Sequence, residues 1–152
     1  MKDLSKDEMI SLLKKQEDGV IAFTEGKTPY CIPFGHVLVN ETVYLSLFPK
    51  GRKWDLIQNN PNVCFNVYRW NDDHTEWYSV VVDGVIEPVN EIPEIESVVS
   101  ALIVKMGLEP ESYLEKRMKY YTDNLDNPKG LKVFKIKASS MGGKTMPTMM
   151  GK

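Results

Sequence analysis

The sequence predicts a mainly β fold, a small antiparallel β-barrel with flanking helices. Short runs rich in Val, Ile, Phe and Tyr recur along the chain, as expected for strands with at least one buried face. Most connections between these runs are short, which favours antiparallel neighbours because parallel pairs need long crossovers. The length of 152 residues, 42% of them hydrophobic, fits one domain with one core.

The composition indicates which classes of partner and which cellular compartment to expect. A net charge of −2 argues against nucleic-acid binding, which needs a broad basic face, so any anion site must be local. No apolar run reaches the roughly 18 residues that a membrane span needs. The N-terminus lacks a signal-peptide core, so we expect a cytoplasmic protein with no membrane partner. Cys31 and Cys64 lack metal-ligand or redox spacing, and we expect both as reduced core residues.

The first predicted element is a helix from Ser5 to Gln16. Ser5 and Glu8 form a Ser-x-x-Glu capping box, and Leu4 and Met9 are placed for a hydrophobic staple around it. Asp18-Gly19 then ends the helix.

Strands follow this helix. The predicted strands are Val20–Thr24, Tyr30–Phe34, His36–Val39, Val43–Phe48, Val63–Trp70, Trp77–Val89 and Lys132–Ala138. Gly26 and the pair Asn40-Glu41 mark turns between neighbouring strands. Pro33 lies within the second strand. Because proline cannot donate to a sheet ladder, this strand should lie at an edge, a bulge or a break.

Two helices separate the last two strands. Apolar residues at helical spacing form one stripe in residues 93–107 and another in residues 110–125, and such stripes face a core or a subunit interface. Residues 139–152 are rich in Gly, Ser and Met without periodicity. We therefore expect one domain over residues 1–138 and a mobile C-terminal tail over 139–152. The alternative is that Lys144 folds back over a site.

Gly51-Arg52-Lys53 is the first candidate binding motif. Gly51 permits close backbone approach, and a helix from about Lys53 to Asn59 would offer unpaired N–H groups at its start. Arg52 can grip phosphate oxygens with two N–H groups, while Lys53 adds a point charge. The alternative is a pair of solvated cations beside a turn. Since cations oppose the dipole at a helix N-terminus, their presence there favours an anion at the same place.

A phosphate alone would not hold a cofactor, so an attached ring must be buried as well. Each charge-assisted hydrogen bond contributes roughly 1.5–3 kcal/mol, whereas micromolar affinity needs about 8 kcal/mol. The run "CIPFGH" suits a flat ring, because Pro33 interrupts the ladder and Gly35 lets a ring approach the backbone. A simple bulged strand is the alternative for this segment.

The two histidines do not predict a metal site. Neither His36 nor His74 has a Cys, Asp or Glu at ligand spacing, and no nucleophile elbow accompanies them. His74 is expected in an exposed hairpin, whereas His36 lies where it could face a bound ring. Three aromatic residues are expected in barrel packing or in a dimer contact: Trp70, Trp77 and Tyr78.

With these motifs in order, the chain resembles a known family. The succession of a helix, a strand, "PYCIPF", a strand, "VYLSLFPKGRKWDLIQNNPNVCFNV" and "VVVDGVIEPV" is similar to the pyridoxamine 5′-phosphate oxidase-related, FMN-binding split-barrel family. Within it, the subgroup with nitroimidazole-resistance proteins is most similar. The resemblance covers Glu8 to Val89 and, more loosely, the last strand. Its most specific part is Gly-Arg-Lys after "YLS", then a helix ending at Asn-Pro, then "VCF".

The resemblance implies a six-stranded antiparallel split β-barrel that forms a homodimer, with FMN in clefts between the subunits. By position, Arg52 and Lys53 would hold the FMN phosphate. Ser46 and Leu47 on a neighbouring strand would also touch the cofactor. The residues that would line the isoalloxazine ring, with the last of them only nearby, are Ile32, Pro33, Phe34, Gly35 and His36.

One departure affects the substrate. The vitamin B6 oxidases of this family complete their site with a C-terminal Trp and Arg, and here neither residue follows Arg117. We therefore expect an FMN-dependent oxidoreductase acting on another small molecule, with chemistry supplied by the flavin and no catalytic side chain identified. The alternatives are a non-enzymatic flavin- or haem-binding protein and a deazaflavin-binding protein on the same fold.

Overall fold

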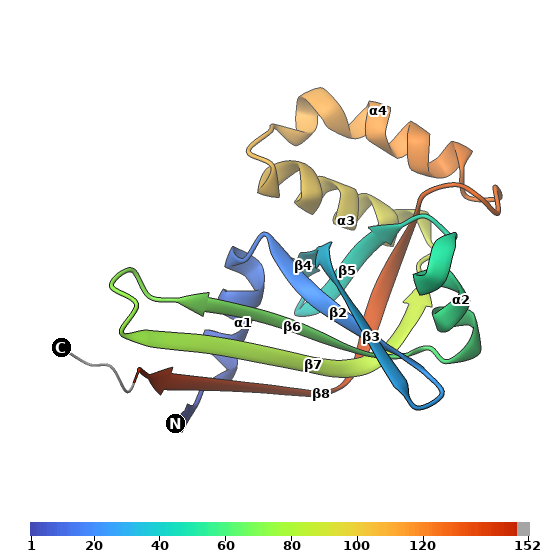
Figure 1. Ribbon diagram of the computed structural model, residues 1–152. Coiled ribbons are helices and arrows are strands. Elements are labelled where there is room, and N and C mark those ends of the chain that lie inside the picture. The colour runs from blue at the N-terminus through green and yellow to red at the C-terminus, as the bar shows by residue number, and fades with distance from the viewer. Residues whose placement is uncertain (149–152) are drawn as a thin grey trace.

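The computed structural model describes residues 1–148, which form eight strands and four helices (Figure 1). The strands are β1 (Lys2–Asp3), β2 (Asp18–Glu25), β3 (Thr28–Gly35), β4 (Val37–Val39), β5 (Thr42–Leu47), β6 (Asn62–Trp70), β7 (Glu76–Pro88) and β8 (Lys132–Pro147). The helices are α1 (Lys6–Lys15), α2 (Gly51–Asn59), α3 (Ile92–Lys105) and α4 (Pro110–Asp123).

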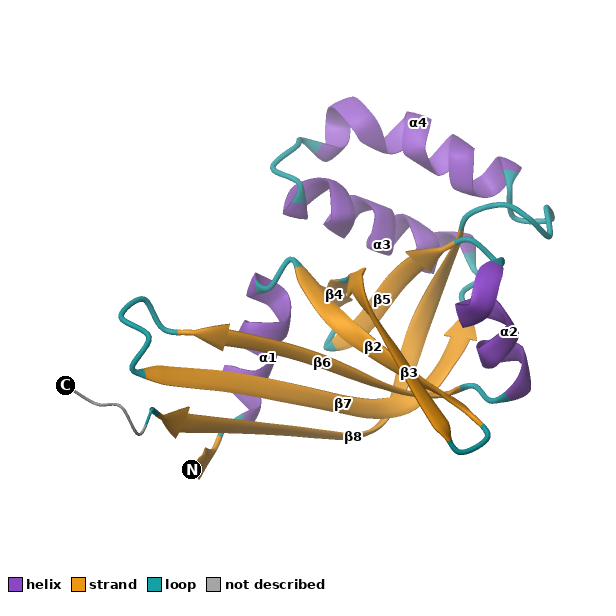
Figure 2. Ribbon diagram, in the orientation of Figure 1, coloured by secondary structure: helices purple, strands orange, loops and turns teal. Residues whose placement is uncertain are grey.

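All of the strands join one antiparallel sheet in the order β3-β2-β6-β7-β8-β5-β4, and β1 pairs with β8. The sheet curls until its edge strand β3 contacts β5, and Figure 2 shows the strands of the curled sheet with the helices around them. This confirms the predicted mainly β split barrel with flanking helices. The sheet has seven main strands and the short β1, whereas the family resemblance implies six strands. Pro33 lies on the edge strand, so the edge alternative holds.

Helix α1 forms where its start signals predict. Ser5 is the N-cap, the capping box with Glu8 is present in both directions, and the helix ends before the cap residue Gln16. Its inner face buries Leu12 and Leu13 in the main core, where Leu13 is fully inaccessible to solvent. The helix therefore closes one end of the barrel.

Helices α3 and α4 form a pair over the strands β4 and β5 (Figure 1). The predicted stripe of α3 is core, with Ile95, Val98, Val99 and Ile103 buried. No residue of α4 is fully buried, and its stripe is only half-buried against α3. Within residues 1–148, no helix has the length and apolar character needed to cross a membrane.

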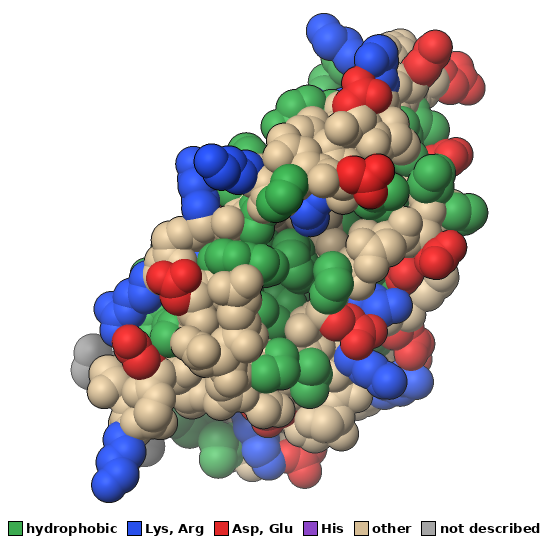
Figure 3. Space-filling view, turned by 90° about the vertical axis from the view of Figure 1, so that its right-hand side faces the viewer, with side chains coloured by type: hydrophobic (Ala, Val, Ile, Leu, Met, Phe, Trp, Pro, Cys, Tyr) green, Lys and Arg blue, Asp and Glu red, His purple; other side chains and the backbone are tan. Residues whose placement is uncertain are grey.

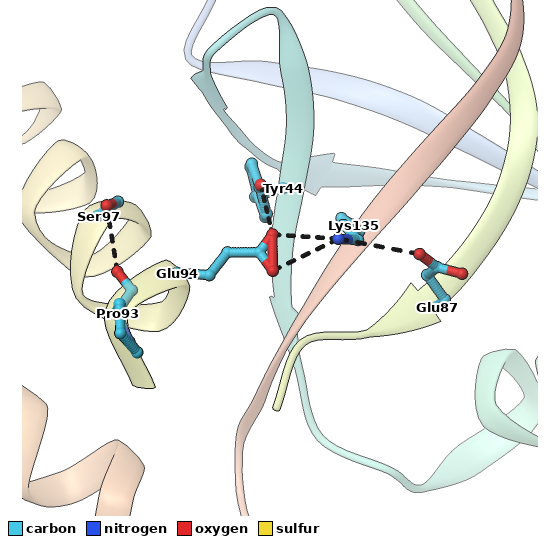
Figure 4. Close-up of polar contacts among 6 residues, drawn as sticks. All are labelled: Tyr44, Glu87, Pro93, Glu94, Ser97 and Lys135. Carbon is cyan, nitrogen blue, oxygen red and sulfur yellow. Dashed lines mark hydrogen bonds and ion pairs between the residues drawn. The ribbon is translucent and has the colours of Figure 1, made fainter. Parts of the chain in front are cut away.

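A polar network fixes α3 to the barrel (Figure 4). Tyr44 on β5 donates its hydroxyl to Glu94 Oε2 at 2.8 Å, and Lys135 Nζ on β8 donates to the same oxygen at 3.1 Å. Glu87 lies 3.9 Å from Lys135 and extends the network to β7. Burial raises the pKa of Tyr44 to about 12, and the Tyr44 hydrogen bond lowers the pKa of Glu94. The tyrosine thus remains a donor and the glutamate an acceptor.

The expectation of a mobile tail is wrong as far as Pro147. β8 continues from Lys132 to Pro147 and pairs with β7 from Phe134 to Pro147, so the expected boundary at residue 138 falls inside a strand. Gly143 is buried beneath α1, where an added Cβ would come within 2.7 Å of Met9 Cγ. Lys144 pairs with Asp3 rather than with the predicted site. The remainder of the expected tail, 149–152, lies outside the described residues.

The expectation for the cysteines is wrong in part. Both thiols are free, but Cys31 is exposed and Cys64 half-buried. The two lie in one row across three strands, because each pairs with Ala22 on β2. Their strand-like surroundings are therefore the outer face of the sheet and not its core.

Candidate functional site

The candidate site lies where the edge of the curled sheet meets the start of α2. β3 has a strand neighbour on one side only, and its other edge approaches β5, which leads into α2. Figure 3 looks onto the side of the molecule that carries α2, where hydrophobic side chains gather in the middle and charged side chains surround them. The free edge of β3 and the start of α2 thus lie next to this apolar surface.

The start of α2 concentrates positive charge. Lys50 is the N-cap without a side-chain cap, Gly51 has a φ of +79°, and the first turn contains no acidic residue. Arg52 and Lys53 follow within that turn, where unpaired N–H groups and the helix dipole already make the potential positive. The helix begins two residues earlier than expected, which brings Arg52 into it. An anion placed at this turn would stabilise the arrangement.

Arg52 joins α2 to the hairpin between β2 and β3. Its guanidinium lies over the ring of Tyr30, 4.0 Å from the ring centroid, and its Nη2 lies 3.2 Å from Glu25 Oε2. Both ends of this ion pair are about half exposed, so the pair holds Arg52 weakly. Within residues 1–148, the one hydrogen-bond acceptor of Lys53 Nζ is the Lys50 carbonyl, at 3.4 Å. Both cations can therefore turn toward an incoming anion at small cost.

The residues expected to line a ring divide between the two faces of β3. Ile32 and Phe34 turn inward and pack against the core, whereas Pro33 and Gly35 are exposed on the outer face. The reason is the two-residue period of a strand. No flat ligand on one face of β3 can therefore contact all four residues through their outward and inward sides at once.

The backbone of β3 offers a different contact. Proline is tolerated in a strand only where its nitrogen does not face the partner strand. Pro29, Cys31 and Pro33 are every second residue of β3, so their backbone N and C=O groups point to the same side of the strand. Because β2 is the partner strand, the prolines require that this side be the one away from β2. The N–H and C=O of Cys31 therefore point to the open edge beside β5 and α2. A planar ligand with donors and acceptors along its rim can bind there.

His36 does not face the opening, contrary to expectation. Its side chain is only 2% exposed, its Nε2 lies 2.7 Å from the Leu13 carbonyl, and its ring packs edge-on against Phe65. Its Nδ1 is buried without a hydrogen-bond partner in the described part of the chain. Burial lowers its pKa to about 4, so the neutral ring donates from Nε2. Local sequence could not show that α1 covers this side chain.

Ser46 and Leu47 also point in opposite directions. Ser46 Oγ lies 3.0 Å from the hydroxyl of Tyr121 on α4, whereas Leu47 is buried in the main core. Only Ser46 can contribute a polar group to the outside of the barrel. Among the residues predicted from the sequence, the structure thus brings together Arg52, Lys53 and the β3 edge.

The sequence reasoning missed Tyr30, Glu25 and Tyr121. Tyr30 lies beneath the Arg52 guanidinium, and Glu25 neutralises part of its charge. An aromatic residue on a strand has no local signal that distinguishes a ligand wall from core packing. The pairing of residues 30 and 52 exists only after the hairpin folds against α2.

The outer face of the sheet next to this site is uncovered and mixes small apolar side chains with the polar Asn66 and Asp83. Its rows include Cys31, Ala22 and Cys64 across β3, β2 and β6, and Pro33 and Val20 beside them. All are exposed or half-exposed. A groove of about 590 Å³ continues this face along β2 and β6, between Pro33 and the exposed rings of Tyr68 and Trp70. Those two rings therefore do not pack inside the barrel.

Comparisons with known proteins point to one family. The family described as pyridoxamine 5′-phosphate oxidase matches residues 5–144. No curated protein matches the sequence. No group of three His, Cys, Asp or Glu side chains that could hold a metal ion occurs within residues 1–148.

Solved structures share the fold at low identity. An FAD-binding protein from Mycobacterium smegmatis superposes with a TM-score of 0.67 at 21% identity, covering 95% of this chain and 99% of that one. An FAD-binding protein from Mesorhizobium loti gives 0.65 at 22%, covering 95% and 97%. A NimC/NimA family protein from Clostridium acetobutylicum gives 0.56 at 15%, covering 91% and 84%. The fold is thus one that flavin-binding proteins use.

The buried His36 predicts a pH dependence of stability. Its pKa is lower in the folded chain, so the unfolded chain takes up the proton first as pH falls. Stability should be complete above the unfolded pKa of about 6.5 and decrease toward the folded value of about 4. Between pH 7 and pH 5 we expect a loss of about 2 kcal/mol in the free energy of unfolding, measured by urea titration.

Matched variants assign this loss to one side chain. His36→Leu should be less stable at pH 7 and should lack most of the decrease between pH 7 and pH 5. His74→Asn removes the exposed histidine at a positive φ and should keep the decrease. An unchanged decrease in His36→Leu would contradict the assignment.

Proposed function

Because the chain belongs to the pyridoxamine 5′-phosphate oxidase family, we propose that it is a flavoprotein that binds FMN at the start of α2. The phosphate would lie on Arg52 and Lys53, and the ring would lie along the open edge of β3. The observation that carries this proposal is the concentration of positive charge in the first turn of α2, which the half-exposed Glu25 compensates only in part. A dianion there would satisfy the cations, the free N–H groups and the helix dipole together.

The geometry supports both halves of such a ligand. Arg52 is held only by a half-exposed carboxylate and by the face of Tyr30, so it can rotate onto a phosphate. The Cys31 backbone faces the opening, which suits hydrogen bonds to the rim of a flavin ring. Two of the similar structures are FAD-binding proteins. FAD contains the same riboflavin phosphate, so this site would also accept that part of FAD.

The proposed activity is that of an FMN-dependent oxidoreductase acting on a small molecule. The flavin, when bound, would supply hydride or electron transfer. The chain's own residues would bind and orient it: Arg52 and Lys53 fix the phosphate, and the β3 edge fixes the ring. His36 is given no direct part, since its side chain is buried and its Nε2 lies 2.7 Å from the Leu13 carbonyl.

We also propose a homodimer that closes the site. The outer face of the sheet exposes Val20, Ala22 and Pro33 beside the ring position, and a second copy would cover it. The groove along β2 and β6 adjoins the same face. Covering this surface would exclude water from the ring as well as bury apolar side chains.

The double variant Arg52→Ala with Lys53→Ala tests the cofactor site. We expect a folded protein whose affinity for FMN falls about tenfold or more, because two charge-assisted contacts are lost. Far-ultraviolet circular dichroism checks the fold, and quenching of flavin fluorescence measures affinity. The control is Lys14→Ala with Lys15→Ala, an adjacent exposed pair on α1. Equal FMN affinity in the two double variants would remove the assignment.

A charge placed on the outer face tests the dimer. Light scattering at micromolar concentration should give twice the monomer mass for the unaltered chain and the monomer mass for Val81→Arg, whose side chain lies half-exposed on β7. Glu96→Arg introduces the same group on an exposed position of α3 and should remain dimeric. A monomeric unaltered chain would contradict the proposal.

A further inference from the structure

A groove of about 610 Å³ lies along α4 and the loop that follows it. This volume falls in the roughly 300–1,000 Å³ range of small-molecule sites. The proposed cofactor contacts at α2 do not use it. The residues that matter in its lining are Tyr113, Lys116, Arg117, Tyr120, Tyr121 and Leu131.

The lining combines aromatic rings and cations on one side of α4. Tyr113, Arg117 and Tyr120 follow one another at i, i+4 and i+7, so they share a face. The rings of Tyr113 and Tyr120 are 41% and 46% exposed although both are large. This face is distinct from the stripe that packs on α3, which includes Leu114 and Met118. The rings are therefore available to stack on a planar ligand.

Charge on this face is unbalanced. Lys119 is paired with Asp123 at 2.6 Å. In the described part of the chain, Lys116 and Arg117 form no ion pair, and the hydrogen bond recorded for Arg117 is a weak one to Met106 Sδ at 3.6 Å. Two free cations beside exposed aromatic rings complement an anionic, aromatic ligand. Because the net charge of the whole chain is −2, the positive charge of Lys116 and Arg117 is a local feature of this groove.

The groove is joined to strand β5 of the barrel through a hydrogen bond. Tyr121, which lines the groove, lies 3.0 Å from Ser46 Oγ on β5, and β5 leads to α2. The end of α4 is held in place, because Lys132 Nζ donates to the carbonyls of Asn124 at 2.8 Å and Leu125 at 2.7 Å. A ligand in the groove would therefore contact a helix whose position against β5 and β8 is fixed.

We propose that the α4 groove binds the adenosine phosphate part of a dinucleotide. The adenine would stack on Tyr113 or Tyr120, and the phosphate would contact Lys116 and Arg117. The placement beside a flavin rests on the proposed function, whereas the groove and its charge do not. Two molecules carry this group. It would belong either to FAD as the cofactor or to a nicotinamide dinucleotide that delivers electrons.

Binding of ADP-ribose, which has neither a flavin nor a nicotinamide ring, tests the groove by isothermal titration of the FMN-loaded protein. We expect saturable binding that Lys116→Glu with Arg117→Glu weakens about tenfold or more, because charge-assisted contacts become repulsive. The control, Lys14→Glu with Lys15→Glu, reverses an adjacent exposed pair on α1 and should bind as the unaltered chain does. Absence of binding, or equal loss in both double variants, would overturn the proposal.

Two further titrations identify the source of the group. If the groove holds the cofactor's own adenosine, FAD binds more tightly than FMN and the reversal at residues 116 and 117 abolishes the difference. If it holds an electron donor, FAD and FMN bind equally and the reversal weakens NADPH binding instead. Should FMN fail to bind, the proposed function fails, and the ADP-ribose titration of the bare chain still decides the groove. If Lys116→Glu with Arg117→Glu changes neither the affinity difference between FAD and FMN nor the affinity for NADPH, the proposal is overturned.

Discussion

The first turn of α2 concentrates positive charge at a place where the helix dipole disfavours it. Lys50, Arg52 and Lys53 surround free backbone N–H groups, and the only carboxylate that Arg52 meets within residues 1–148 is the half-exposed Glu25. Such an arrangement costs stability unless an anion compensates it. The remaining features of the site follow from this constraint, because a ligand with an anionic end must place its other end along the neighbouring edge of β3.

The fold explains why that edge is available. A sheet that curls without closing leaves β3 with one strand neighbour, and two prolines on it reduce its ability to pair with another strand. The same curl brings Tyr30 beneath Arg52 and Ser46 against Tyr121. Elements far apart in the sequence thus meet at the opening, while the network of Tyr44, Glu94 and Lys135 keeps the helical pair in place above it. Rigid surroundings suit a site whose role is to orient a cofactor.

Much of the fold could be predicted from local signals. The capping box at Ser5, the turn at Asn40-Glu41 with its two positive φ angles, and the apolar stripe of α3 all lie where the sequence places them. The β8 extension could not be predicted, because Gly142 and Gly143 weaken the local strand preference and the pairing comes from β7 and β1, which are distant in the sequence. Local sequence also does not show which side chains meet at the site in the folded chain. His36 is buried by α1, and the alternating faces of β3 separate residues that are neighbours in the chain.

The most direct test compares FMN with riboflavin, which has the same ring and no phosphate. Flavin fluorescence is titrated with the unaltered chain under identical salt. If the cations at the start of α2 hold a phosphate, FMN binds saturably and riboflavin binds at least about tenfold more weakly, since at least one charge-assisted contact is missing. Equal affinity for the two flavins, or no binding of either by folded protein, would contradict the electrostatic basis of the site.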